Sequence, residues 1–164
     1  MRIGIVSDTH GEADRLRSAL AIFRAHDAEA IVHCGDLGTT KCLRILAAAG
    51  SAVYMVAGNM DRHVEELVAL ADELSVHFAW EVIEVPLGDG RRLVATHGHD
   101  GKILGELVHD AQLPYVCFGH THRMLDERHG SVHVINPGAL HNVHTPTVAV
   151  LDTDTDTVEH VVVP

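Results

Sequence analysis

Several short segments of the sequence place a carboxylate, amide or imidazole directly after an apolar run, most of them beside a glycine. They are Asp8-x-His10, Gly35-Asp36, Gly58-Asn59, His97-Gly98-His99 and Gly119-His120-Thr121-His122. Singly, each has an ordinary structural explanation, because aspartate caps helices, asparagine and glycine favour turns, and a lone histidine is usually just hydrogen-bonded. Independent capping does not explain their repetition in one short chain, so we interpret them as one joint metal site.

The candidate ligands form a mixed oxygen and nitrogen set without a thiolate. Such a set suits borderline-hard cations such as Mn²⁺, Fe²⁺, Zn²⁺ or Ni²⁺. It is too large for one tetrahedral zinc, and it suffices for two cations that share a carboxylate, about 3.5–4 Å apart in the usual two-metal arrangement. The candidate metal ligands are Asp8, His10, Asp36, Asn59, His97, His120 and His122.

Secondary structure must bring these segments together. Apolar, β-branched runs of strand length recur along the chain, and helical patterns lie between them at 12–26, 39–49, 62–74 and 101–111. The second half is richer in strands, and we interpret its acidic run at 152–159 as a hairpin turn. We therefore predict an α/β fold with two mixed β-sheets packed as a sandwich and flanked by helices. Strand-end loops are where open α/β folds place their sites.

Length and composition favour a single domain over residues 1–164, because the chain is 46% hydrophobic and too short for two ordinary domains. A net charge of −11 without a basic run argues against binding to duplex nucleic acid. The exposed edges of a sandwich make a homodimer plausible.

The N-terminal segment lacks the features of a signal peptide, and no apolar run approaches the length of a membrane span. The cysteines, Cys34, Cys42 and Cys117, are odd in number and contain no CxxC pair, which argues against a disulfide framework or a zinc knuckle. We interpret Cys34 and Cys117 as small apolar residues of buried strands, and we expect the protein to be cytoplasmic.

The ordered motifs resemble those of the calcineurin-like metallophosphoesterase superfamily. They span residues 8 to 122 and include Asp61 in Gly58-Asn59-x-Asp61. The short length resembles the small single-domain prokaryotic phosphodiesterase branch of that superfamily, and "NPGAL" at 136–140 is similar to the Asn-Pro-Gly turn of that branch.

This resemblance implies a four-layer α-β-β-α fold and two divalent ions, commonly manganese. One metal would be held by Asp8, His10, Asp36 and His122, and the other by Asp36, Asn59, His97 and His120. Asp36 would then bridge the metals, and a hydroxide between them would attack phosphorus in line. Catalysis would thus depend on Asp36, Asn59 and His97 through the metal-activated water, with a small phosphodiester as substrate.

Met60 departs from the pattern, because many members of the superfamily have histidine after the asparagine, where it assists the leaving oxygen. A thioether has no proton to give. We therefore expect a phosphodiesterase with weak monoesterase activity and no clear general acid, and we favour this over a role of His63 as the acid. A non-catalytic or weakly catalytic scaffold on the same fold remains the alternative, although every ligand position is filled. An HExxH zinc motif and a Gly-rich phosphate loop are both absent from the sequence.

Other polar residues could lie at the rim of the site. Arg62 and Arg123 could contact a phosphate oxygen, but a solvated role is at least as plausible. For His99, His133, His141 and His144 a structural role is the better expectation.

Overall fold

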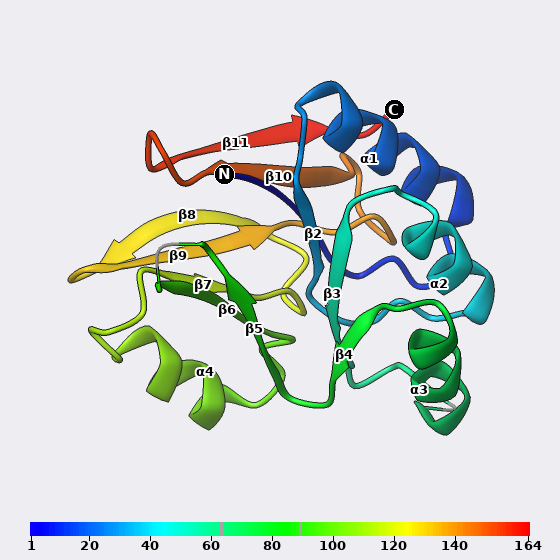
Figure 1. The fold of residues 1–164 in the computed structure, drawn as a ribbon, viewed down its shortest axis with the longest axis horizontal. Coiled ribbons are helices and arrows are strands. Elements are labelled where there is room, and N and C mark those ends of the chain that lie inside the picture. The colour runs from blue at the N-terminus through cyan, green and yellow to red at the C-terminus, as the bar shows by residue number, and fades with distance from the viewer. Residues whose placement is uncertain (63, 89) are drawn as a thin grey trace.

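The computed structural model describes residues 1–62, 64–88 and 90–164, and it contains a sandwich of two β-sheets with helices outside (Figure 1). In chain order the elements are β1 (Arg2–Val6), α1 (Ala13–Ala25), β2 (Ala30–His33), α2 (Thr40–Ala47), β3 (Ala52–Val56), α3 (Val64–Glu73), β4 (His77–Ala79), β5 (Val82–Pro86), β6 (Arg92–Thr96), α4 (Gly101–Val108), β7 (Tyr115–Cys117), β8 (Met124–His129), β9 (Val132–Pro137), β10 (Thr147–Asp152) and β11 (Thr157–Val162).

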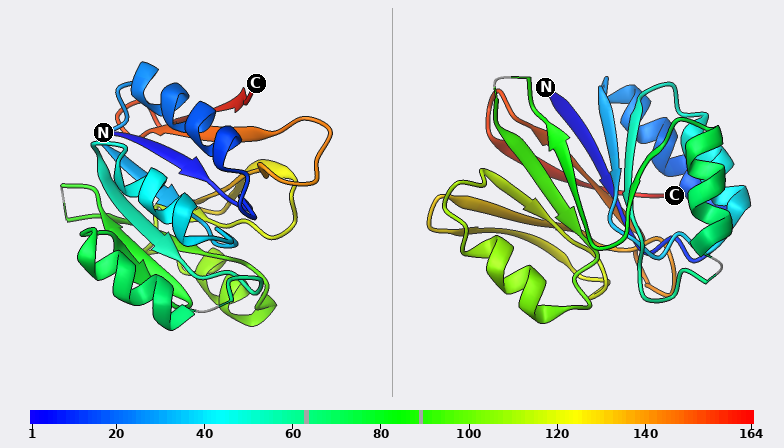
Figure 2. Two further views of the ribbon diagram at one scale, coloured as in Figure 1. Left: turned by 90° about the vertical axis from the view of Figure 1, so that its right-hand side faces the viewer. Right: turned by 60° about the horizontal axis from the view of Figure 1, so that its bottom comes forward.

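Both sheets are mixed, as predicted. The six-stranded sheet has the order β11-β10-β1-β2-β3-β4, and the five-stranded sheet has the order β5-β6-β7-β9-β8. Strands β1 to β4 run parallel, as do β6, β7 and β9, whereas β10, β11, β5 and β8 pair antiparallel with their neighbours. Helices α1, α2 and α3 cover the outer face of the larger sheet and α4 lies against the smaller one, so the layers are α, β, β and α (Figure 2).

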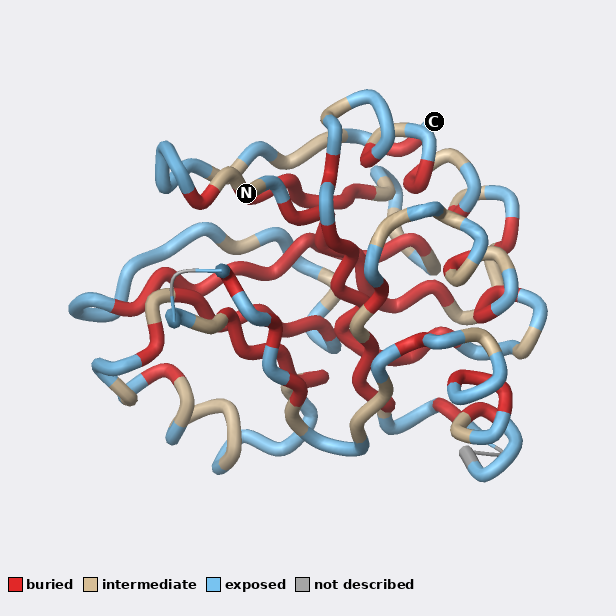
Figure 3. The backbone as a smooth tube through the Cα atoms, in the orientation of Figure 1, coloured by how far each residue is buried: buried red, intermediate tan, exposed pale blue. Residues whose placement is uncertain are grey.

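Three apolar clusters hold these layers together. The first, with Leu16 and Phe23, lies between α1 to α3 and the larger sheet; the second, with Ile5 and Ile135, lies between the sheets; and the third, with Val116, lies under α4. The buried residues concentrate in the central strands (Figure 3). Burial of each large aliphatic or aromatic side chain stabilises the fold by about 1.5–3 kcal/mol. The strand ends therefore extend from a rigid apolar frame.

The predicted helices are all present, and the acidic run near 152–159 forms the β10–β11 hairpin. Strands β4 and β8 were not predicted. β4 has only three residues, and β8 exposes most of its side chains at a sheet edge, so neither produces an apolar run. Asp89 and His63 lie outside the described residues.

All three cysteines are buried free thiols. Burial raises the pKa of the thiols of Cys34 and Cys117, in agreement with their interpretation as apolar core residues. Within the described part of the chain, no helix is both long and apolar enough to cross a membrane.

Candidate metal centre

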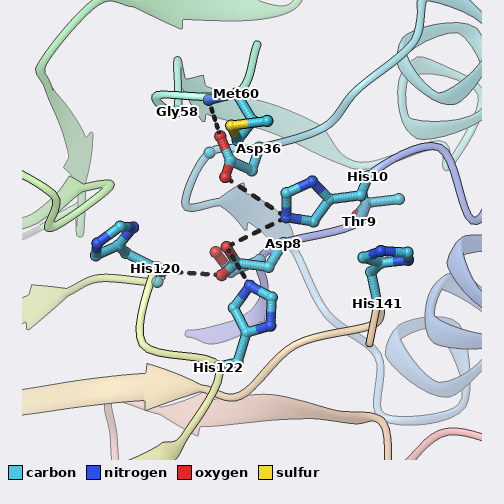
Figure 4. A network of polar contacts seen from close by, with 12 residues as sticks. Asp8, Thr9, His10, Asp36, Gly58, Met60, His120, His122 and His141 are labelled. Atoms are coloured by element: carbon cyan, nitrogen blue, oxygen red, sulfur yellow. Dashed lines mark hydrogen bonds and ion pairs between the residues drawn. The ribbon is translucent and has the colours of Figure 1, made fainter. Parts of the chain in front are cut away.

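Two buried carboxylates, Asp8 and Asp36, form the middle of the candidate site (Figure 4). They follow the parallel strands β1 and β2, whose carboxyl ends lie at the same edge of the sheet. One oxygen of each is held by a backbone N–H: His120 N donates to Asp8 Oδ2 at 2.9 Å, and Met60 N donates to Asp36 Oδ1 at 2.7 Å. The opposite oxygens, Asp8 Oδ1 and Asp36 Oδ2, face a group of imidazole rings.

Three imidazole Nε2 atoms approach these free oxygens. His122 Nε2 lies 3.2 Å from Asp8 Oδ1, and His97 Nε2 lies 3.4 Å from Asp36 Oδ2. His10 Nε2 lies between the carboxylates, 3.8 Å from Asp8 Oδ1 and 3.5 Å from Asp36 Oδ2. Among the described residues, Asp8 Oδ1 and His10 Nε2 are buried without a hydrogen-bond partner. Because buried polar atoms are normally paired, these two need a further partner.

The second half of the site centres on His97, which follows β6 of the smaller sheet. Its Nδ1 lies 2.8 Å from the Cys34 carbonyl oxygen and its Nε2 lies 3.0 Å from Asn59 Oδ1. Since a carbonyl can only accept, Nδ1 donates its proton to Cys34, and Nε2 is the nitrogen that could give up its own proton to bind a cation. The His120 ring packs edge-on against the His97 ring, with centroids 5.1 Å apart.

The structure thus brings all seven predicted ligands to one place. Possible ligand atoms lie within 4.8 Å of one another in two groups, Asp8 with His10 and His122, and Asp8 with Asp36 and His97. Such oxygen and nitrogen donors, partly unpaired and buried, fit divalent cations. His120 meets the site through its backbone N–H and its ring contact with His97.

Burial and mutual attraction shift the pKa values of these groups. Burial alone would raise the pKa of Asp36, but hydrogen bonds from His97 and the Met60 amide outweigh burial and lower it. Burial would lower the pKa of His97, but Asp36 and the Cys34 carbonyl outweigh burial and raise it. For His10, burial prevails over the attraction of Asp36 and Asp8, so its pKa is lowered. The site therefore holds Asp36 as an anion and favours a positive charge beside it.

The backbone is strained at the site. Asp8, His10, Asp36, His120 and His122 all have positive φ angles, between 44° and 63°. Non-glycine residues rarely adopt this left-handed conformation, and such strain concentrates at functional sites because the surrounding structure must enforce it.

Two glycines of the motifs allow close approach to the carboxylates. A Cβ on Gly58 would lie 2.0 Å from Asp36 Oδ1, and a Cβ on Gly119 would lie 2.7 Å from Asp8 Oδ2. Asp61 fixes the same loop by accepting hydrogen bonds from Gly38 N at 2.8 Å and Gly58 N at 2.9 Å. The glycines beside the predicted ligands therefore make room for the carboxylates.

Sequence reasoning missed His33, which supports the site from within β2. Gly35 N donates to His33 Nδ1 at 3.2 Å, so Nε2 carries the proton and donates to Thr9 Oγ1 at 2.9 Å. Burial is the main reason that the pKa of His33 is lowered to about 3, which keeps the ring neutral. Through these two hydrogen bonds His33 holds the loop that carries Asp8 against the loop that carries Asp36. Its only signal in the sequence is a histidine inside the apolar run "AIVHCGD".

The rim candidates separate into three kinds. His141 packs against the His10 ring at 5.0 Å and bonds to Glu12 Oε1 at 3.1 Å, while the His99 ring lies 5.4 Å from that of His97. His133 instead contacts Asp126 on β8. His144, Arg62 and Arg123 are exposed.

A sandwich with this cluster at its strand ends defines a metallophosphoesterase-type protein. The chain belongs to the calcineurin-like phosphoesterase superfamily, because the model of that superfamily domain matches residues 1–156. It is 31% identical to phosphodiesterase MJ0936 of Methanocaldococcus jannaschii over 157 residues, which cover 94% of each chain. It is also 26% identical to phosphodiesterase YfcE of Escherichia coli strain K12 over 159 residues, covering 85% of this chain and 79% of YfcE.

Solved structures agree with this assignment. A structure described as a novel archaeal phosphodiesterase superposes with a TM-score of 0.90 at 28% identity and covers 99% of both chains. A zinc complex of Vps29 from Entamoeba histolytica superposes with a TM-score of 0.66 at 17% identity over 100% of both chains, a likeness that shows the fold alone.

Proposed function

We propose that this protein is a metal-dependent phosphodiesterase that holds two divalent cations. The observation that carries the proposal is the pair of inward oxygens, Asp8 Oδ1 and Asp36 Oδ2, which face three imidazole Nε2 atoms at 3.2 to 3.8 Å. The relatives named phosphodiesterases support the same conclusion.

The ligands divide between two metals according to the side of Asp36 on which they lie. Asp8, His10, Asp36 and His122 would hold the first metal. Asp36, Asn59, His97 and His120 would hold the second, with Asp36 bridging, and the mixed donor set suits manganese. Asp36 suits a bridging role because its Oδ2 faces both His10 and His97, one from each half of the site.

Bound divalent cations supply an activated water as the nucleophile and neutralise the phosphoryl group. The chain's own residues hold the geometry. Met60 N and His120 N fix one oxygen of each carboxylate, and the Cys34 carbonyl fixes the tautomer of His97. The seven ligands contain only two formal negative charges, so the occupied pocket attracts phosphoryl groups although the chain carries a net charge of −11.

Met60 favours diesters over monoesters. Its amide donates to Asp36, its side chain lies beside that carboxylate (Figure 4), and the residue is 46% exposed. A thioether cannot protonate a leaving alkoxide, but an apolar group tolerates the second substituent of a diester. We expect weak monoesterase activity, with good leaving groups such as nitrophenolate turned over fastest.

We further propose that residues 1–164 form one domain, because both sheets share the apolar cluster between them. Proteolysis that releases a stably folded fragment would contradict this.

Metal analysis combined with matched kinetics tests the function. We expect about two ions per chain by elemental analysis after loading with Mn²⁺, and faster hydrolysis of bis(p-nitrophenyl) phosphate than of p-nitrophenyl phosphate. A stoichiometry that never exceeds one ion per chain would overturn the dinuclear proposal. Metal binding without hydrolysis of any diester or monoester in a panel would favour the scaffold alternative.

A further inference from the structure

The turn at 136–141 contacts two parts of the candidate metal centre, although none of its residues is a predicted ligand. On one side Asn136 Nδ2 donates to the Gly119 carbonyl oxygen at 2.8 Å. On the other side His141 N donates to the Asp8 carbonyl oxygen at 3.1 Å. The turn therefore joins the loop that follows β7 to the loop that follows β1.

Helix α1 holds the end of this turn from two positions. Arg15 Nη1 donates to the Leu140 carbonyl oxygen at 2.6 Å, and Glu12 Oε1 lies 3.1 Å from His141 Nδ1. Glu12 occupies the N-cap position of α1, where a side chain often bonds to the first helical amides, but it makes no such bond. Because an ionised carboxylate only accepts, Nδ1 donates this hydrogen bond, and the His141 ring is held in one orientation.

The ring of His141 packs against that of His10, with centroids 5.0 Å apart and planes at 45°. Figure 4 shows His10 between Asp36 on one side and His141 on the other. In the described part of the chain the His10 ring forms no hydrogen bond, and its Nε2 lies no closer than 3.5 Å to the carboxylates. By contrast, the Cys34 carbonyl oxygen holds the ring of His97. His10 thus lacks the hydrogen-bonded partner that usually orients a ligating histidine.

We propose that Glu12 and His141 are positioning residues that hold the His10 ring in the orientation needed to bind the first of the two cations. This inference rests on the proposed two-metal phosphodiesterase and adds two residues that act through a ligand. A ligand without support must lose rotamer freedom when the ion binds, which weakens binding. The His122 ring also contacts His10, at 5.6 Å, but it belongs to a candidate ligand, whereas His141 is anchored outside the ligand set.

Titration calorimetry of Mn²⁺ into the metal-free protein tests this role independently of catalysis. The wild type should bind two ions. His141→Ala removes the ring that packs against His10 and should weaken one ion about tenfold, as changes around metal ligands do. The ion on the side of Asn59 and His97 should bind as in the wild type. A general structural defect would weaken both ions and lower the Tm of the metal-free protein, so an unequal loss identifies positioning.

Substitutions of the anchor separate positioning from direct binding of the ion. Glu12→Ala and His141→Phe each keep a ring against His10 without its hydrogen bond, so each should weaken the same ion less than His141→Ala does. Glu12→Gln should bind nearly as the wild type, because its amide oxygen accepts the same bond. His144→Ala, exposed in the same loop, is the matched control and should change neither ion. Equally weak binding in His141→Phe and His141→Ala, with Glu12→Ala unchanged, would make His141 itself a ligand and overturn the positioning role.

The outcomes separate the positioning role from the proposed function. Two bound ions, one of them weakened in His141→Ala, in a protein that hydrolyses no ester would support the positioning role and reject the phosphodiesterase. Diester hydrolysis by the wild type, with both ions bound equally tightly in the wild type and His141→Ala, would reject the positioning role alone. A wild type that binds no Mn²⁺ would reject both.

Discussion

The two ends of the sandwich each bury a histidine among carboxylates, but they differ in how these groups are paired. Away from the candidate site, His133 is 4% exposed; its Nε2 lies 2.6 Å from Asp126 Oδ1 and its Nδ1 lies 3.3 Å from Asp156 Oδ1. Asp156 also accepts hydrogen bonds from Tyr115 and Arg128. Both nitrogens of the His133 ring therefore have protein partners.

At the candidate site the pairing is incomplete. Asp8 Oδ1 and His10 Nε2 are buried without hydrogen-bond partners, and the contacts of His10 to the carboxylates are 3.5 Å or longer. The two ends are well separated, because Asp156 lies in the β10–β11 hairpin and β10 runs antiparallel to β1, with Asp152 paired to Arg2 at the start of β1. The paired groups around His133, which we call the closed network, serve stability. The groups around Asp8 and Asp36, which we call the open cluster, keep unpaired atoms that can bind a cation.

The largest effect should come from removing one of the candidate metal ligands of the open cluster. Asp36→Ala or His97→Ala should lower kcat/KM for bis(p-nitrophenyl) phosphate by more than about 100-fold, because loss of residues outside the ligand shell already costs about 10- to 100-fold. Circular dichroism should stay unchanged, since the site lies at loop ends. Asp126→Asn is the matched control in the closed network. Near-wild-type turnover in either ligand variant would place the chemistry elsewhere.

A smaller loss of activity should follow from adding a Cβ atom against the open cluster without removing a ligand. In Gly58→Ala the new Cβ would meet Asp36 Oδ1 at 2.0 Å, so the carboxylate must move. We expect activity to fall about 10- to 100-fold, with weaker Mn²⁺ affinity by titration calorimetry. Gly105→Ala in α4 is the control, because its Cβ would meet nothing within 4 Å. If both variants behaved alike, close packing around Asp36 would not matter for metal binding.

A gain of function should follow from giving the open cluster a proton donor. Met60→His should speed hydrolysis of diesters with poor, alkoxide leaving groups by about tenfold, less than the roughly 10²–10⁴-fold of an optimised general acid. Nitrophenyl esters should gain little, because nitrophenolate needs no proton. Met60→Leu controls for the change in side-chain shape. A Met60→His variant unchanged towards every poor leaving group, or a wild-type preference for monoesters, would remove the basis of this prediction.

The open cluster could be predicted from sequence better than the closed one, for a physical reason. Its residues lie at the ends of apolar strands, where parallel pairing brings Asp8 and Asp36 together, so order and spacing predict proximity. The closed network joins β8, β9 and the last hairpin, and its contacts depend on an exposed edge strand that has no apolar pattern. His133 was accordingly a rim candidate in the sequence and lies at the other end of the molecule.

Supporting residues were the hardest part of the site to predict. His33 lies within a buried strand, and its role comes from hydrogen bonds to Thr9 and Gly35. Such positions follow from strand register, which composition and spacing do not specify.

His33 should make the protein sensitive to acid. Its pKa is about 3 in the folded protein and near 6.5 when unfolded, so between these values the unfolded chain binds one more proton. The free energy of unfolding should therefore rise with pH over this window and level off above it, by up to about 1.4 kcal/mol per pH unit. His33→Gln can keep both hydrogen bonds without titrating. Its urea-unfolding free energy should depend less on pH than that of the wild type, and parallel pH profiles would contradict this assignment.

The smallest effect on activity should come from opening the closed network. His133→Phe removes the partner of Asp126 and Asp156 but fills the same space between the sheets, and both carboxylates are about half exposed and can turn to water. Loss of these hydrogen bonds should cost about 1–2 kcal/mol of stability, and each kcal/mol lowers Tm by about 2–4 °C in a chain of this size. Activity and Mn²⁺ stoichiometry should stay within about twofold of wild type, because both depend on the opposite end of the sheets. Calorimetric melting and steady-state kinetics on the same preparation would check both halves of this expectation. A His133→Phe variant with normal Tm and reduced metal content would mean that the two ends are coupled, and that the difference in pairing does not separate stability from function.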